Sequence, residues 1–181
     1  MPINLANLIL WESAARGPIA ARVAICGDFL PAGKLGMGCD ESWSGKARSL
    51  REYFADVTTT FANLEATLDS ETLAPRVLNG LGQIVAAPVA SLGYMEAIQS
   101  HAVGIANNHS YDFGDTGVQR TRAAVAFTGM TPLGAGFSTR EPQEVFVWEG
   151  PGGVRVGFWA AAKAASELTT RSGKRLLLLL Q

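Results

Sequence analysis

Short apolar runs alternate with helical segments along most of this chain. The runs predict strands over residues 22–26, 57–64, 101–106 and 130–133. Between them, helical spacing is found over residues 47–54, 89–99 and 116–128. Alternation of this kind is typical of an α/β sheet whose strands are joined by crossover helices. The length of 181 residues fits one such domain.

A β-hairpin is expected after the alternating part. Residues 143–148 alternate in the manner of a strand, residues 150–153 are rich in glycine, and residues 154–159 form a second apolar arm. We therefore predict a lead-in over residues 1–21 and an α/β domain over residues 22–160. Residues 161–181, which include five consecutive leucines, are expected to be irregular or aberrant.

Smaller features complete the expected fold. Residues 31–45 are predicted to form an irregular loop, and residues 160–165 carry a weak helical pattern. Asp115 is placed to cap the helix that follows it, and Gly129 to end that helix. Cys26 lies inside an apolar run and is expected to be a buried thiol, which fits a reducing compartment.

The charge and hydropathy of the chain argue against two classes of partner. With 15 basic and 16 acidic residues the net charge is −1, so nothing favours binding to nucleic acid or to an anionic membrane. No stretch approaches the roughly 20 apolar residues of a membrane helix. The apolar run at residues 8–11 has no basic residue before it, as a secretory signal would. A cytoplasmic location without a membrane span is therefore expected.

The stretch at residues 105–117, I-A-N-N-H-S-Y-D-F-G-D-T-G, lies at a strand-to-helix junction. In open α/β sheets, ligands bind at the carboxyl ends of the strands. Asn108, His109 and Asp112 bring oxygen and imidazole donors there, and such donors bind hard or borderline metals. The alternative is a polar loop whose Asn and Asp side chains only stabilise turns. Both interpretations stay open at this point.

Two carboxylates follow the neighbouring predicted strands. Asp28 follows the first strand and Glu65 closes the second, so both would meet His109 if the strands are neighbours. The set suits Mn²⁺, Fe, Zn²⁺ or Mg²⁺. Two ions about 3.5–4 Å apart would activate water and stabilise a phosphoryl oxygen. Asp112 could orient His109 or, equally well, only form the turn before Gly114.

Three motifs in order resemble a known family. They are Gly27-Asp28, Asn63-Leu64-Glu65, and the block at residues 106–114, A-N-N-H-S-Y-D-F-G, followed by Gly117. Together they resemble the CapA-type capsule-synthesis family, which is associated with poly-γ-glutamate capsule synthesis. That family is similar to a branch of the calcineurin-like metallophosphoesterases. The resemblance covers roughly residues 22–160 and includes Leu133-Gly134-Ala135-Gly136.

The resemblance implies a metallophosphoesterase-like sheet with flanking helices. It also implies metal ligation by Asp28, Glu65, Asn108 and His109, with His109 at the catalytic centre and Asp112 supporting it. The cofactor would be divalent Mn, Fe, Zn or Mg, in a site that is dinuclear in full-length members. The implied partners are a capsule polymer or a phosphate-containing small molecule, and the implied location is the cell envelope.

The chain departs from the family in length and in histidines. Family members are about twice as long, and their second half supplies further histidine ligands. This chain has only His101 and His109, and His101 stands at the start of a strand, away from the predicted site. We therefore expect the N-terminal half of such a domain, truncated after the hairpin. An exposed sheet edge would then favour self-association.

Three functional hypotheses follow. The first is a metal-dependent hydrolase of the phosphoesterase-like type that acts in capsule polymer synthesis. The second is a non-catalytic binding component of an envelope polymer assembly, which the incomplete ligand set favours. The third is an inactive, truncated fragment, which the missing second half and the leucine run favour.

Overall fold

A mostly parallel sheet forms the centre of the molecule. The structure is a computed structural model, and it describes residues 9–11, 18–31, 41–75, 84–135, 145–162, 175–176 and 179–180. The sheet has five strands in the order β1-β2-β3-β6-β7. Its parallel strands are β2 (Val23–Phe29), β3 (Thr59–Leu64), β6 (Ser100–Gly104) and β7 (Thr131–Leu133). The four predicted strands and the predicted α/β class are therefore confirmed.

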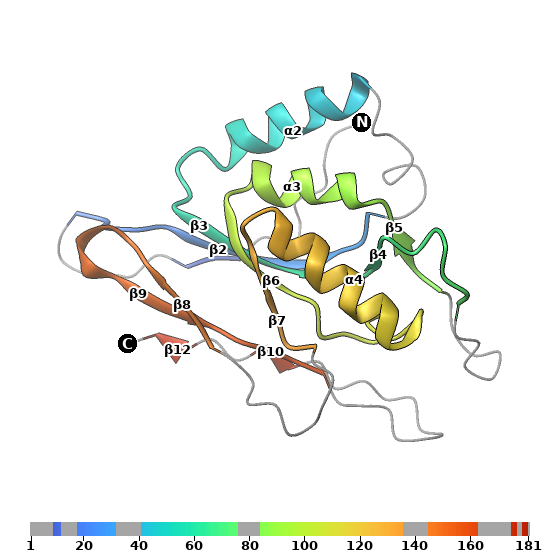
Figure 1. The fold of residues 1–181 in the computed structure, drawn as a ribbon. Coiled ribbons are helices and arrows are strands. Elements are labelled where there is room, and N and C mark those ends of the chain that lie inside the picture. The colour runs from blue at the N-terminus through green and yellow to red at the C-terminus, as the bar shows by residue number, and fades with distance from the viewer. Residues whose placement is uncertain are drawn as a thin grey trace.

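Helices cover one face of this sheet (Figure 1). They are α2 (Glu41–Tyr53), α3 (Leu92–Ala97) with the 3-10 turn η1 (Val89–Ser91) before it, and α4 (Gly114–Phe127). In α4, Val118, Thr121 and Val125 are buried on one side, as their helical spacing predicts. Gly129 follows the end of α4 with a φ of 85°, the left-handed conformation that commonly ends a helix.

The predicted hairpin is present on the opposite face of the sheet (Figure 1). It consists of β8 (Phe146–Glu149), the 3-10 turn η2 (Pro151–Gly153) and β9 (Arg155–Phe158). The strand β12 (Leu179–Leu180) pairs with β9, and β10 (Ala160–Ala161) pairs with β11 (Arg175–Leu176). The central sheet thus lies between helices on one side and a small antiparallel sheet on the other.

The alternation of side chains along β3 and β6 creates two hydrophobic cores. Ala62 and Val103 face the helices and belong to a core with Met95. Their neighbours Phe61 and Ala102 face the hairpin and belong to a second core. Successive side chains of a strand point to opposite faces, so a strand covered on both faces is apolar throughout.

Another very small sheet lies beside the amino-terminal half of α4. It pairs β4 (Thr67–Leu68) with β5 (Ala86–Ala87) in parallel. The Leu68 amide donates to Oγ1 of Thr121 on α4 at 2.9 Å. These two strands fall in residues 66–87, which carry no clear pattern in the sequence.

Several expectations need correction. The lead-in contributes the strand β1 (Ile9–Trp11), which pairs antiparallel with β2. The irregular loop predicted over residues 31–45 is wrong from Glu41 onward, where α2 begins. Residues 32–40 of that loop lie outside the described part. Ala160 and Ala161 form a strand instead of starting a helix, because they pair with Arg175 and Leu176. Of the described residues after Ala160, Ala161 pairs with Arg175, and Leu179 and Leu180 pair with β9.

Two side-chain expectations also differ. Asp115 lies inside the first turn of α4, because the helix begins at Gly114 and Phe113 occupies the capping position without a side-chain bond. Cys26 is half-buried instead of fully buried, and this burial raises the pKa of its thiol to about 11. Within the described part of the chain, no helix has the length and hydrophobicity to cross a membrane.

Candidate functional site

The carboxyl ends of β2, β3 and β6 meet at one edge of the sheet. Asp28 pairs in register with Asn63, and Asn63 pairs with Gly104, three residues before Asn107. The side chains of Asp28 and Asn63 are in contact, because Nδ2 of Asn63 donates to Oδ1 of Asp28 at 2.7 Å. The parallel arrangement therefore places the predicted strand-end residues along one edge.

The turn after β6 is held by its own short-range hydrogen bonds. The Ser110 hydroxyl accepts from the Asn107 amide at 2.8 Å and donates to the Ile105 carbonyl at 2.6 Å. The Asp112 amide reaches the His109 carbonyl at 3.3 Å, and Gly114 closes the turn with a φ of 65°. These bonds hold the backbone on which His109 sits.

Asn107 ties this turn to the end of β3. Its side chain is buried, and its Nδ2 donates to the Leu64 carbonyl at 2.7 Å and to Oδ1 of Asn63 at 3.2 Å. Its Oδ1 accepts from the His109 backbone amide at 2.9 Å. The side-chain amide of Asn107 thus joins the turn to β3. Asn108, the next residue, is exposed at the surface.

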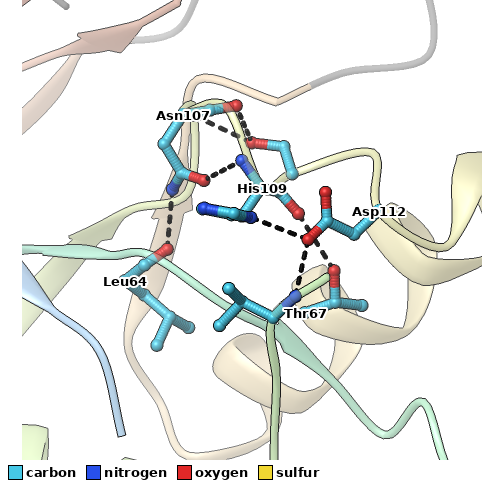
Figure 2. A network of polar contacts seen from close by, with 7 residues as sticks. Leu64, Thr67, Asn107, His109 and Asp112 are labelled. Atoms are coloured by element: carbon cyan, nitrogen blue, oxygen red, sulfur yellow. Dashed lines mark hydrogen bonds and ion pairs between the residues drawn. The ribbon is translucent and has the colours of Figure 1, made fainter. Parts of the chain in front are cut away.

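A carboxylate orients the ring of His109. Nδ1 of His109 lies 2.7 Å from Oδ2 of Asp112, and the same oxygen accepts from the Val85 backbone amide at 2.7 Å. The carboxylate is an acceptor only, so it favours the tautomer that carries the proton on Nδ1. Figure 2 shows the second ring nitrogen pointing away from Asp112. An imidazole held in this way presents a free lone pair on Nε2, as histidine ligands of metals do.

The four predicted metal ligands share the edge without closing around one point. Asp28 and Asn108 are exposed, Glu65 and His109 are half-buried, and the Glu65 amide donates to the Phe29 carbonyl at 2.9 Å. Across the described residues, no three His, Cys, Asp or Glu side chains gather closely enough to hold a metal ion. The donor types suit a divalent cation, and the contact with Asp112 fixes the His109 ring, but the described side chains do not form a complete ligand group.

A family comparison agrees with the order of these motifs. The family model described as bacterial capsule synthesis protein PGA_cap matches residues 22–176. The chain belongs to this family. The match runs from the start of the first parallel strand into β11, and it confirms the CapA-type resemblance of the sequence. No curated protein matches the chain.

The other histidine of this PGA_cap chain lies at the opposite end of the sheet. His101 is the second residue of β6, and its Nδ1 is 2.8 Å from Oγ1 of Thr59, the first residue of β3. Its ring packs beside that of Trp148, with 6.2 Å between the ring centroids. His101 is therefore remote from the carboxyl edge, as its place in the sequence indicates.

The structural role of Asn63 was not predicted from the sequence. The motif Asn63-Leu64-Glu65 draws attention to the carboxylate, yet the amide two residues earlier makes the contacts to Asp28 and Asn107. Alternation along a strand was the available signal, because residues two apart point to the same face. Thr67 was also missed, and its hydroxyl donates to the His109 carbonyl at 3.1 Å.

Proposed function

We propose that this PGA_cap-family chain is a metal-dependent hydrolase of the phosphoesterase-like type that acts in capsule polymer synthesis. The observation that supports this most is the His109–Asp112 pair, which leaves Nε2 of an oriented imidazole available at the carboxyl edge of a parallel sheet. The proposed substrate is a polymer of the poly-γ-glutamate type or a phosphate-containing small molecule. An envelope-associated place of action belongs to the same proposal.

His109, Asp28, Glu65 and Asn108 are the residues that would hold the cation. They offer one imidazole nitrogen and several oxygens, a mixture that suits Mn²⁺, Fe or Zn²⁺ and, through its oxygens, Mg²⁺. A bound divalent cation would supply Lewis-acid activation of water and stabilise negative charge on a phosphoryl or acyl oxygen. Asp112 would keep the proton on Nδ1 of His109, and Asn107 would hold the His109 backbone in place.

The two histidines give a matched test. Elemental mass spectrometry of the purified chain should find Mn, Fe or Zn near one equivalent or above. The metal should be lost in His109→Ala and kept in His101→Ala, because His101 lies at the opposite end of the strands. A chromogenic phosphodiester assay with Mn²⁺ then tests turnover. Equal metal content in the two variants would contradict the proposed site.

A second function is favoured by one specific observation. Within the described residues, no three-membered group of acidic, histidine or cysteine side chains closes around a metal position. A non-catalytic binding component of an envelope polymer assembly needs no such group. Polymer binding by the purified chain without metal-dependent turnover, unchanged in His109→Ala, would favour this function over the hydrolase.

A further inference from the structure

A line of side-chain hydrogen bonds crosses three neighbouring elements at the carboxyl edge. It runs from Asp28 on β2 to Asn63 on β3, then to Asn107 after β6, and ends at the His109 backbone amide. The separate distances are 2.7, 3.2 and 2.9 Å. This line connects a predicted acidic ligand to the backbone of the predicted imidazole ligand.

The direction of every bond in the line follows from its two ends. A carboxylate can only accept, so Asn63 must turn its NH₂ group toward Asp28 and its oxygen toward Asn107. Asn107 must then donate to Asn63, and it does so while also donating to the Leu64 carbonyl. Its oxygen is left to accept the His109 amide. A flipped Asn63 would set an oxygen against Asp28 and an NH₂ group against Asn107.

We propose that Asn63 is a positioning residue of this site, which fixes the Asp28 carboxylate relative to the turn that carries His109. The expected effect on metal binding rests on the proposed function, whereas the line of hydrogen bonds from Asp28 to His109 does not depend on it. Asn63 is half-buried and its bond to Asp28 is exposed to solvent. Loss of this bond should therefore alter the site more than the overall stability.

Thr59 offers a matched control on the same strand. Its hydroxyl joins β3 to β6 through His101 at 2.8 Å, at the opposite end of the sheet. Thr59→Val thus removes an inter-strand side-chain bond of similar length without touching the carboxyl edge. Asn63→Leu removes the amide at nearly constant size, and Asn63→Ala serves as a second variant if Leu at this position disturbs folding.

The first readout is independent of metal. Asp28→Asn should shift the His109 backbone amide resonance in two-dimensional ¹H–¹⁵N spectra, because the change at Asp28 is passed through Asn63 and Asn107. In an Asn63→Leu background, Asp28→Asn should leave that resonance unmoved. In a Thr59→Val background, Asp28→Asn should shift the His109 amide resonance as it does in the wild type. A shift that persists without the Asn63 amide would overturn the inference.

The second readout is Mn²⁺ affinity, measured by titration calorimetry with MnCl₂. Asn63→Leu should weaken binding about tenfold or more, as loss of a residue that orients a ligand does, with Thr59→Val unchanged. Asn63→Leu should have no further effect once Asp28 is replaced by Asn, because it acts through that carboxylate. If the losses of Mn²⁺ affinity caused by Asn63→Leu and Asp28→Asn multiply in the double variant, the positioning role is overturned. A wild-type chain that binds no Mn²⁺ would count against the proposed function, and the resonance experiment alone would then decide on Asn63.

Discussion

The Asp112 carboxylate joins two parts of the chain through a single oxygen atom, since Oδ2 lies 2.7 Å from Nδ1 of His109 and 2.7 Å from the Val85 backbone nitrogen. The first contact orients an imidazole, and the second holds the start of the β4–β5 pair against the turn after β6. The side chain of Asp112 is therefore more than a local turn former. It fixes the ring of His109 and the neighbouring backbone together.

Asp112→Asn should weaken metal binding and stability together. The amide oxygen that replaces Oδ2 carries no negative charge, so it accepts from the Val85 amide and from the His109 ring more weakly than the carboxylate does. We expect Mn²⁺ affinity to fall about 10- to 100-fold, and the free energy of unfolding to fall by about 1–3 kcal/mol. Calorimetric titration and urea unfolding measure the two effects. An unchanged Mn²⁺ affinity would mean that the contact between His109 and Asp112 stabilises the turn but plays no part in metal binding.

The adjacent residues Asn107 and Asn108 should respond in opposite ways to replacement by Leu. Asn107→Leu leaves the Leu64 carbonyl and the His109 amide without their side-chain partner, at a cost of about 2–3 kcal/mol. Asn108→Leu alters an exposed position, so the free energy of unfolding should stay within about 0.5 kcal/mol of wild type. If Asn108 is one of the metal ligands, Asn108→Leu should lose Mn²⁺ affinity without losing stability, whereas Asn107→Leu should lose stability.

Gly134 and Gly129 give a matched pair with positive φ angles. A Cβ at Gly134, where φ is 92°, would lie 2.1 Å from the Ala160 carbonyl oxygen. At Gly129, where φ is 85°, nothing lies within 4 Å. Gly129→Ala should therefore cost about 1 kcal/mol for the backbone alone, and Gly134→Ala about 3 kcal/mol because the clash adds to it. Equal losses in thermal unfolding would show that β7 and β10 do not approach each other this closely.

The core between the central sheet and the hairpin depends on Phe61. Its ring stacks on that of Phe158 with 5.2 Å between the centroids and 7° between the planes. Phe61→Ala should lower the free energy of unfolding by about 3–5 kcal/mol. Phe127, which is 93% exposed, provides the control, and Phe127→Ala should stay within about 0.5 kcal/mol. A small effect of Phe61→Ala would mean that the hairpin contributes little to stability.

Cys26 should react slowly with disulfide reagents. Burial disfavours its thiolate and raises the pKa from 9.0 to about 11, which lowers the thiolate fraction near pH 8 about a hundredfold. The greater nucleophilicity of a more basic thiolate recovers about tenfold of this loss. In a Cys39→Ser background, the reaction with Ellman's reagent should be at least about tenfold slower than in the urea-unfolded chain.

The same pKa gives a pH dependence of stability with a definite sign. Between pH 9.0 and about 11 the unfolded chain releases the Cys26 proton while the folded chain keeps it. The unfolded state then binds fewer protons, so the free energy of unfolding falls as the pH rises through this window. Cys26→Ala should flatten this part of the profile in urea unfolding between pH 8 and 11. A Cys26→Ala profile as steep as that of the parent chain would contradict the assignment.

Much of this molecule is determined by patterns between neighbours in the sequence. The apolar runs and the helical spacings are local, so they predict β2, β3, β6, β7, the helices and the hairpin. The order of the motifs around Asp28, Glu65 and His109 was enough to indicate the family. The separation of three residues between His109 and Asp112 allowed their contact, without distinguishing it from a simple turn.

Tertiary structure decided the rest, because the deciding contacts join residues far apart in the chain. Asn63 meets Asp28 across 35 residues, Asn107 meets Asn63 across 44, and Asp112 meets Val85 across 27. Such contacts depend on strand order and register, which no local periodicity contains. The pairing of Ile9–Trp11 with β2 has the same origin. The sequence thus determined which residue types reach the carboxyl edge, and the register of the parallel strands decided which of them touch.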